Sequence, residues 1–309
     1  MKGRRRVSYL ICLEYFFYKK RFTMQSKTTG TLYVVATPIG NLQDITLRAI
    51  DVLKMVDRIA AEDTRHSAPL LKHFAINKPC MSMHEFNERE RLMVLLGYLQ
   101  QGESIALISD AGTPLISDPG FHLVREAKAY GIDVVPIPGP CAAIAALSVA
   151  GLPTNKFTFE GFLPAKQEAR RNRLIVLLHE TRTMIFYEAP HRIMSVLQTM
   201  AEVFGYARKV VVARELTKIH ETIQTHTLEG LIKHFESHTN ELRGEFVIVV
   251  DGVDEETSSS KEVIPEHVLD VLLEELPLKQ AAALASKITG ERKNVLYEMA
   301  LAKKGGSGD

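Results

Sequence analysis

Tryptophan is absent from this 309-residue chain, and cysteine occurs only at Cys12, Cys80 and Cys141. These cysteines are odd in number, lie far apart and form no Cys-x-x-Cys pair, so the sequence predicts neither a disulfide framework nor a zinc site. This usage is typical of a reducing compartment, and we expect a cytoplasmic protein. The net charge is only +1, so any contact with RNA must come from a local patch.

Two common nucleotide-binding motifs are also missing. The chain has no G-x-G-x-x-G and no G-x-x-x-x-G-K-[ST], so neither a Rossmann dinucleotide site nor a P-loop is indicated. The composition, 46% hydrophobic and 24% charged, is that of an ordinary globular protein. The length exceeds that of one typical core and favours two or three folded units.

The first 29 residues resemble a signal peptide only superficially. Basic Met1–Arg6 precedes apolar Val7–Tyr18, but Glu14 interrupts the apolar run and no small-residue cleavage site follows. The run is also too short to span a bilayer. We interpret residues 1–29 as an extension, disordered or non-native, with Met24 as the plausible initiator; a weak membrane-surface anchor is the alternative.

Short β-branched runs, such as the strands expected at Arg58–Ala61 and Lys209–Arg214, alternate with helical patterns through most of the chain, which predicts an α/β protein. We expect two α/β domains, at 30–152 and 153–252, since Gly151-Leu152-Pro153 interrupts the alternation. A mainly parallel sheet covered on both faces is expected in the first. The acidic, serine-rich residues 253–264 read as a linker, and 265–303 as a small C-terminal helical module. We expect three helices in this module, at Pro265–Glu275, Leu278–Ile288 and Glu291–Leu301.

The most informative segment is the loop Ser109–Gly120, with the sequence SDAGTPLISDPG. It follows a predicted strand and precedes a predicted helix, and open α/β sheets bind ligands at this position. Its small residues could present main-chain groups to a flat polar ligand. An ordinary surface turn is the alternative. The loops Thr37–Asn41 and Pro138–Ala143 have the same position relative to their strands.

Several segments occur together in this order: ATPIGN, AEDTR, SDAGTPLISDPG, IPGPCA, GFLPAK, FYEAPHR, ARELTKIHE and RGEFVIVV. In combination they resemble the tetrapyrrole methylase superfamily over about residues 30–252. The resemblance is closest to the branch that methylates the ribose 2′-hydroxyl of a cytidine in the decoding region of 16S ribosomal RNA. The C-terminal helices are similar to the helix-turn-helix-like appendage of that branch.

This resemblance implies S-adenosyl-L-methionine as cofactor, S-adenosyl-L-homocysteine as product, and no metal. It also implies a cofactor cleft between the two α/β domains, a homodimer, and 16S rRNA or the small ribosomal subunit as partner, with no membrane. Many superfamily members have Gly-Gly-Asp where this chain has Asp110-Ala111-Gly112. The implied cofactor-binding residues are Pro38, Asp110, Ala111, Gly112, Leu115, Cys141, Ala142, Glu188 and Leu216. Cys141 would serve by its small size, and a buried small residue is the alternative.

Methyl transfer to a ribose hydroxyl needs in-line alignment and a group that takes up the proton or stabilises the developing charge. Polar residues after predicted strands are the candidates, and we predict Asp63, Arg65 and Lys166 as the catalytic set. A helix N-cap is the alternative for Asp63. Further candidates are Glu188, His191, Arg192, Arg214 and Glu215, of which the last two could form a structural ion pair.

The basic segment Lys166–Arg173 is the best local patch for RNA phosphates. We predict RNA binding by Arg170, Arg171 and Arg173, and by Arg292 and Lys293 of the helical module. A solvated helix face is the alternative.

We consider three functions, the preferred one first: the RNA 2′-O-methyltransferase, a methyltransferase acting on a small tetrapyrrole, and a non-catalytic RNA-binding protein. The intact loop Ser109–Gly120 weighs against the third.

Overall fold

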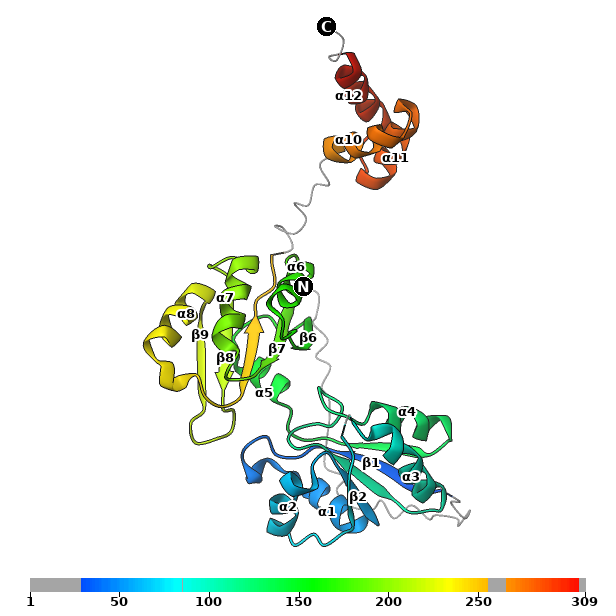
Figure 1. Cartoon of the computed structure of the whole chain (residues 1–309), viewed down its shortest axis with the longest axis vertical. Coiled ribbons are helices and arrows are strands. Elements are labelled where there is room, and N and C mark those ends of the chain that lie inside the picture. Colours follow the sequence, from blue (N-terminus) through cyan, green and yellow to red (C-terminus); the bar gives the residue numbers. More distant parts are fainter. Residues whose placement is uncertain (1–28, 85, 255–264, 306–309) are drawn as a thin grey trace, which may run out of the picture. The chain divides into compact units, whose positions relative to one another are not determined.

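The structure, a computed structural model, describes residues 29–84, 86–254 and 265–305. The interpretation of residues 1–28 and of most of the predicted linker therefore lies outside the described residues. The chain divides into two compact units, one of residues through Pro38 plus Leu42–Gly139, the other of Ile39–Asn41 plus the residues from Pro140 onward. The helices after residue 264 contact one another and form a module of their own (Figure 1).

The first unit contains a five-stranded sheet in the order β3-β2-β4-β1-β5, in which every pairing is parallel. The strands are β1 (Thr31–Val35), β2 (Arg58–Ala61), β3 (Cys80–Ser82), β4 (Ile105–Ile108) and β5 (Asp133–Ile137). The helices are η1 (Leu42–Asp44), α1 (Leu47–Met55), α2 (Thr64–His73), α3 (Glu88–Gln100) and α4 (Phe121–Ala129). The predicted parallel sheet is confirmed.

Both faces of this sheet are covered, because its strands carry apolar side chains on both sides. One core joins Val35, Ile59 and Ile108 to α1 and α2. The other joins Leu32 and Leu107 to α3 and α4 on the opposite face (Figure 1). Because helices cover both faces, the loops that follow two neighbouring strands can run to opposite faces of the sheet. Such divergence opens a crevice for a ligand at the ends of the strands.

The second unit has a five-stranded mixed sheet in the order β6-β7-β10-β8-β9. Its strands are β6 (Phe157–Phe162), β7 (Thr183–Glu188), β8 (Lys209–Arg214), β9 (Thr222–Thr227) and β10 (Phe246–Val250). Its helices are α5 (Ala142–Val149), α6 (Gln167–Val176), α7 (Ile193–Phe204), α8 (Leu228–Ser237) and η2 (Thr239–Glu241). The fully buried β10 pairs antiparallel with both β7 and β8, which the sequence patterns did not indicate.

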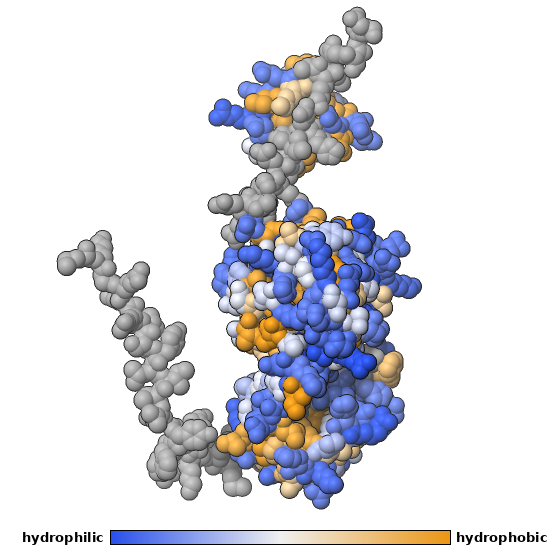
Figure 2. All heavy atoms as spheres, turned by 90° about the vertical axis from the view of Figure 1, so that its left-hand side faces the viewer, coloured by the Kyte–Doolittle hydropathy of each residue, from blue (hydrophilic) through white to orange (hydrophobic). Residues whose placement is uncertain are grey.

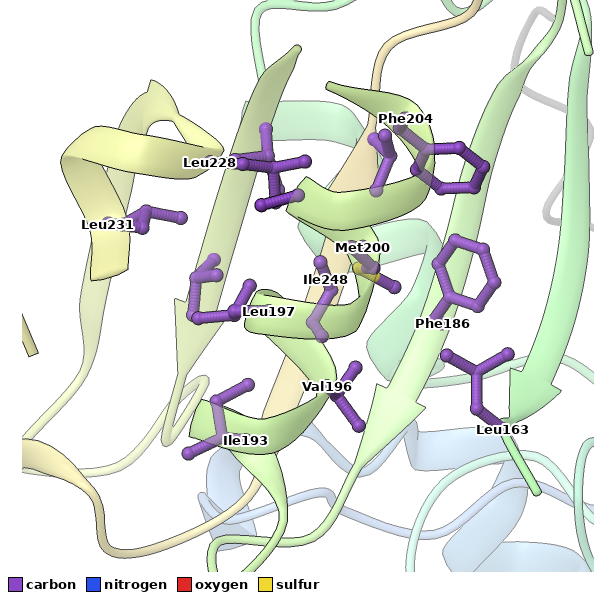
Figure 3. Packing of buried hydrophobic residues seen from close by; sticks show 14 of the residues in the cluster. Leu163, Phe186, Ile193, Val196, Leu197, Met200, Phe204, Leu228, Leu231 and Ile248 are labelled. Atoms are coloured by element: carbon purple, nitrogen blue, oxygen red, sulfur yellow. The ribbon is translucent and has the colours of Figure 1, made fainter. Parts of the chain in front are cut away.

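The main core of this unit lies between the sheet and helices α6, α7 and α8. Figure 3 shows Val196 and Met200 on the side of α7 that faces Phe186 of β7, with Ile248 of β10 beside Met200. Helix α5 covers the opposite face through small residues. The structure therefore groups α5 with the second sheet, ahead of the predicted boundary at Leu152.

The module consists of α10 (Pro265–Glu275), α11 (Leu278–Thr289) and α12 (Lys293–Gly305), close to the three predicted helices. Leu269, Ala281, Ala285 and Leu296 form its core.

On the face of the protein shown in Figure 2, hydrophilic residues dominate and the hydrophobic patches are separate. Among the described helices, none is both long enough and apolar enough to cross a bilayer.

Candidate active site

The candidate residues of the first unit gather at the carboxyl edge of its sheet. The chain leaves β1 toward α1 on one face and leaves the neighbouring β4 toward α4 on the other. This divergence makes the β1–β4 junction the topological switch point, where open α/β sheets bind ligands. The loop Ser109–Gly120 begins there and runs between β4 and α4, which confirms its predicted position between a strand and a helix.

A short bridge joins the two loops at this junction. The Thr37 amide donates to the Gly112 carbonyl at 2.8 Å, and the Gly112 amide donates to the Thr37 carbonyl at 3.1 Å. The Thr37 hydroxyl also donates to the Ser109 carbonyl at 3.3 Å. Both main-chain polar groups of Gly112 are thus engaged within the protein. A ligand at this edge would meet the exposed Ala111 and the half-buried Pro38 instead.

The long loop has an unusual backbone conformation. Leu115 and Ser117 have φ values of 73° and 69°, a left-handed region that non-glycine residues seldom occupy. Gly120, with φ 118°, ends the loop, and a Cβ there would lie 2.8 Å from the Leu107 side chain. Such strained residues persist only where their surroundings hold them, and they cluster at functional sites.

Asp63 and Arg65 form a close pair at the start of α2. The Asp63 carboxylate caps the helix by accepting the Arg65 amide at 2.8 Å, and it also accepts Nε of Arg65 at 3.1 Å and a terminal guanidinium nitrogen at 2.7 Å. These bonds hold the pKa of Asp63 far below its usual value. The cap interpretation is therefore correct for Asp63, and a carboxylate of such low pKa is a poor proton acceptor. The Arg65 side chain is 91% exposed.

Asp110 connects this pair to the long loop. Its carboxylate accepts the Asp63 amide at 3.1 Å, and its own amide donates to the Glu62 carboxylate at 3.3 Å. The loops that follow β2 and β4 are therefore joined through side chains. The structure brings together Asp63, Arg65 and Asp110, three of the predicted site residues.

Asp118 is a candidate that the sequence analysis missed. Burial raises its pKa to about 6, with the nearby carboxylates of Glu62 and Asp110 adding to the effect and a hydrogen bond with Ser109 opposing it. Strongly perturbed titratable groups cluster at functional sites, and a base works best with a pKa near the operating pH. The repeated Ser-Asp of the loop, at Ser109 and Ser117, was the signal that could have found it.

In the second unit, a cavity of about 30 Å³ is lined by apolar residues and by Glu245. Its lining includes Ala142, at the start of α5, and the buried Leu216, after β8, together with Ile39 of the same core. Two predicted cofactor residues thus meet at one cavity. Cys141 is the N-cap residue of α5, with a half-buried free thiol, which fits a role through small size.

Glu188 and Arg192 support the loop that carries Lys166. A terminal nitrogen of Arg192 donates to the carbonyls of Leu163 and Pro164 at 2.6 and 3.1 Å, and its Nε lies 3.2 Å from the Glu188 carboxylate, without hydrogen-bond geometry. Glu188 is 3% exposed, and burial raises its pKa. Its carboxylate therefore lies inside the unit, whereas Lys166 is exposed at the start of α6.

The loop after β8 also has strained residues, Glu215 with φ 51° and Thr217 with φ 66°. The Glu215 carboxylate accepts the Lys218 ammonium at 2.8 Å, and Nε of Arg214 donates to the Arg243 carbonyl at 2.7 Å. Arg214 and Glu215 are thus held by other residues and do not pair with each other.

The predicted RNA-binding arginines of α6 differ in exposure. Arg170 is 5% exposed and donates to the Thr199 hydroxyl at 3.1 Å, so its guanidinium supports the helix from inside. Arg171 is exposed, and the partly exposed Arg173 pairs with Glu160. In the module, Arg292 and Lys293 are exposed.

Nowhere in the described segments do three or more histidine, cysteine or carboxylate side chains form a group that could hold a metal ion.

Comparison with known proteins gives this arrangement a family. Residues 31–232 match the family model of the tetrapyrrole (corrin/porphyrin) methylases, and residues 261–304 match that of the RsmI C-terminal HTH domain. The solved methyltransferase CobJ is 20% identical with a TM-score of 0.55, over 73% of this chain and 95% of CobJ. Diphthine synthase is 15% identical with a TM-score of 0.56, over 72% and 90%. The chain belongs to the tetrapyrrole methylase family.

Much more similar relatives carry a more particular name. Ribosomal RNA small subunit methyltransferase I of Pseudomonas aeruginosa is 57% identical over 283 residues, which cover 91% of this chain and 100% of that protein. The protein of the same name from Escherichia coli O157:H7 is 50% identical over 289 residues, or 93% and 100%. The resemblance expected from the sequence motifs is confirmed, and it extends through the helical module.

Proposed function

We propose that this chain transfers a methyl group from S-adenosyl-L-methionine to the 2′-hydroxyl of a cytidine ribose in small-subunit ribosomal RNA. The observation that carries the proposal is the identity of 57% with an rRNA methyltransferase, sustained over the full length of that relative. The likeness to the uroporphyrin-III-C-methyltransferase of Thermus thermophilus, at 18% identity, concerns the fold alone and does not favour a tetrapyrrole substrate.

The residues present fit such a cofactor. In the second unit, the small Ala142 and the apolar Leu216 suit contact with the edge of a flat ring. In the first unit, the carboxylate of Asp110 suits a cationic amino group. When bound, the cofactor supplies an electrophilic methyl group on a sulfonium. The long loop, bridged at Gly112 to Thr37, would keep its own shape as the ligands bind, which favours alignment of the reacting atoms.

For proton removal from the ribose hydroxyl we propose Asp118 in place of Asp63. Asp63 accepts several hydrogen bonds from Arg65, and its low pKa makes it a weak base. Asp118, with a pKa of about 6, is ionised at neutral pH and still basic enough to take up a proton. In this proposal Asp63 orients Arg65, the exposed guanidinium contacts a phosphate, and Lys166 stabilises developing charge.

RNA binding is assigned to Arg171, Arg173, Arg292 and Lys293, with Arg170 as an internal support of α6. Exposed cations in such positions attract phosphates and make affinity depend on salt. As the resemblance implies, we expect a cytoplasmic homodimer, which sedimentation of the purified protein would test.

The experiment is mass spectrometry of small-subunit rRNA after incubation with protein and isotopically labelled cofactor. We expect the label on a ribose 2′-oxygen of one cytidine. The test variant is Ala142→Leu, which should fill the cavity and prevent labelling. The matched control is Val149→Leu, at an exposed position of the same helix, which should leave labelling unchanged. Label on a base, or label only on an added tetrapyrrole, would contradict the proposal; RNA binding without any label would indicate a non-catalytic RNA-binding protein.

A further inference from the structure

A second cavity, of about 450 Å³, lies in the first unit where the loops after β2, β3 and β4 meet. Its volume is in the range of small-molecule pockets. The lining residues that matter here are Glu62, Asp63, Arg65, His84, Phe86 and Asp110. The cavity thus adjoins the predicted catalytic residues Asp63 and Arg65 and the second residue of the long loop, Asp110. It is distinct from the cavity described for the second unit.

Phe86 is the unusual member of this lining. Its side chain is 89% exposed, the most exposed phenylalanine among the described residues. Asn87 fixes the local turn: its side chain accepts the His84 amide at 2.9 Å and donates to the Ser82 carbonyl at 3.3 Å. These hydrogen bonds fix the backbone next to Phe86, and its exposed ring lines the cavity and contributes little to the core.

The same turn is tied to the long loop. Glu88, which begins α3, accepts the amides of Gly120 and His122 at 3.2 and 3.1 Å. The aromatic wall of the cavity and the end of Ser109–Gly120 consequently form one hydrogen-bonded assembly. A group stacked on Phe86 would be held at a fixed distance from that loop.

The chemistry of the lining suits one kind of ligand. Proteins that read unpaired RNA bases stack them on aromatic side chains and hydrogen-bond their edges. Carboxylates of this lining such as Glu62 are acceptors that match the exocyclic amino group of cytosine, whereas the corresponding oxygen of uracil would be repelled. Arg65, 91% exposed at the rim, can pair with the adjoining phosphate.

We propose that this cavity receives the base of the target cytidine, turned out of its RNA and stacked on Phe86. The proposal rests on the function proposed above and specifies how its substrate is held. It makes Phe86 a binding residue for the base, and it makes the carboxylates of the lining the source of preference for cytosine over uracil.

The test uses the full-length protein and a short RNA hairpin with the decoding-region sequence, carrying fluorescent pyrrolocytidine at the target position. Base stacking on an aromatic ring contributes enough that Phe86→Ala should weaken RNA binding by roughly 5- to 150-fold and abolish the fluorescence change on binding. Phe86→Tyr, which retains the ring, should remain close to wild type. Tyr130→Ala, at an exposed aromatic position after α4, is the control and should have no effect.

Cofactor affinity, measured by calorimetry, should be unchanged in Phe86→Ala, and this also verifies that the variant is folded. Wild-type protein that methylates rRNA, together with a Phe86→Ala variant of wild-type affinity and fluorescence response, would overturn this inference alone. Wild-type protein that neither binds nor methylates the RNA would overturn the proposed function itself. A hairpin with uridine at the target position should bind more weakly than the cytidine hairpin, and equal affinity would refute the assigned role of the carboxylates.

Discussion

Thr37 and Gly112 pair through their main chains across the β1–β4 junction, each amide donating to the other's carbonyl, at 2.8 and 3.1 Å. Gly112 adopts φ 83° to do so, a conformation that costs an L-residue about 1–2 kcal/mol. The bridge therefore depends on the absence of a side chain at Gly112, and it links the geometry of the long loop to that of the loop after β1.

The first prediction follows from this bridge. Gly112→Ala should lower the free energy of unfolding by about 1–2 kcal/mol and also weaken cofactor binding, because the strained alanine shifts the loop. Calorimetry and urea denaturation measure the two effects. The control is Gly131→Ala, which has φ 71° and no neighbour within 4 Å of an added Cβ. It should lose similar stability with unchanged cofactor affinity; equal loss of affinity in both variants would contradict the prediction.

The raised pKa of Asp118 predicts that the stability of the folded protein depends on pH. The folded protein retains this proton up to about pH 6, whereas an unperturbed aspartate releases it near 3.8, so folding is increasingly penalised as the pH rises between these values. Asp118→Asn should therefore raise the free energy of unfolding by about 1–3 kcal/mol above pH 7 and have little effect near pH 4. Urea denaturation across this range measures it, with exposed Asp51→Asn as control. If the free energies of unfolding of Asp118→Asn and wild type differ by the same amount at every pH, the pKa of Asp118 is not raised.

Arg192 predicts a large effect of one buried ion pair. Arg192→Ala removes the bonds to Leu163 and Pro164 and the ion pair with the buried Glu188, which should cost about 3–5 kcal/mol. Hydrogen exchange should increase in the loop before Lys166. Arg182→Ala, which breaks a surface pair with Glu180, should cost at most about 1 kcal/mol. Similar costs for the two variants would show that Arg192 does not anchor the loop.

The helical module predicts a separation of RNA binding from cofactor binding. Its core is formed within its own three helices, so removal of residues 263–309 should leave cofactor affinity intact. RNA affinity should fall and its salt dependence become shallower, because exposed cations are lost. The variant Arg292→Ala/Lys293→Ala tests the charges without the deletion. Full RNA affinity in the truncated protein, together with a lower melting temperature, would show that the module is only structural.

Strong hydrophobic runs predicted their elements well. Lys209–Arg214 and Arg58–Ala61 are strands with the expected bounds, and Pro265–Glu275 is the expected helix. Elements with weak patterns were missed: β3 has only three residues, β9 has polar residues at most positions, and α3 mixes charges with Gly97. The secondary structure of these segments depends on contacts with neighbouring strands and loops, and the local sequence does not encode those contacts.

Site residues followed the same rule. The edge at which Asp63, Arg65 and Asp110 meet was predictable, because parallel strands end together. The charges did not predict which side chains point inward. Arg170 belongs to a basic run, yet it shares the buried face of α6 with Leu174 and Leu177. Its spacing of four and seven residues from these leucines was the available signal. Phe86 and Asp118 depend on turns that no periodicity describes.

The place of β10 in its sheet has a consequence for biosynthesis. This strand, the last of the second unit in sequence, lies between β7 and β8 and is the element that joins them. Until Val250 has left the ribosomal tunnel, β6–β7 and β8–β9 are two separate strand pairs with exposed edges, and isolated pairs of strands are at best marginally stable. The nascent second unit must therefore wait for its final strand, while the first unit, whose strands are complete at Ile137, can fold ahead of it.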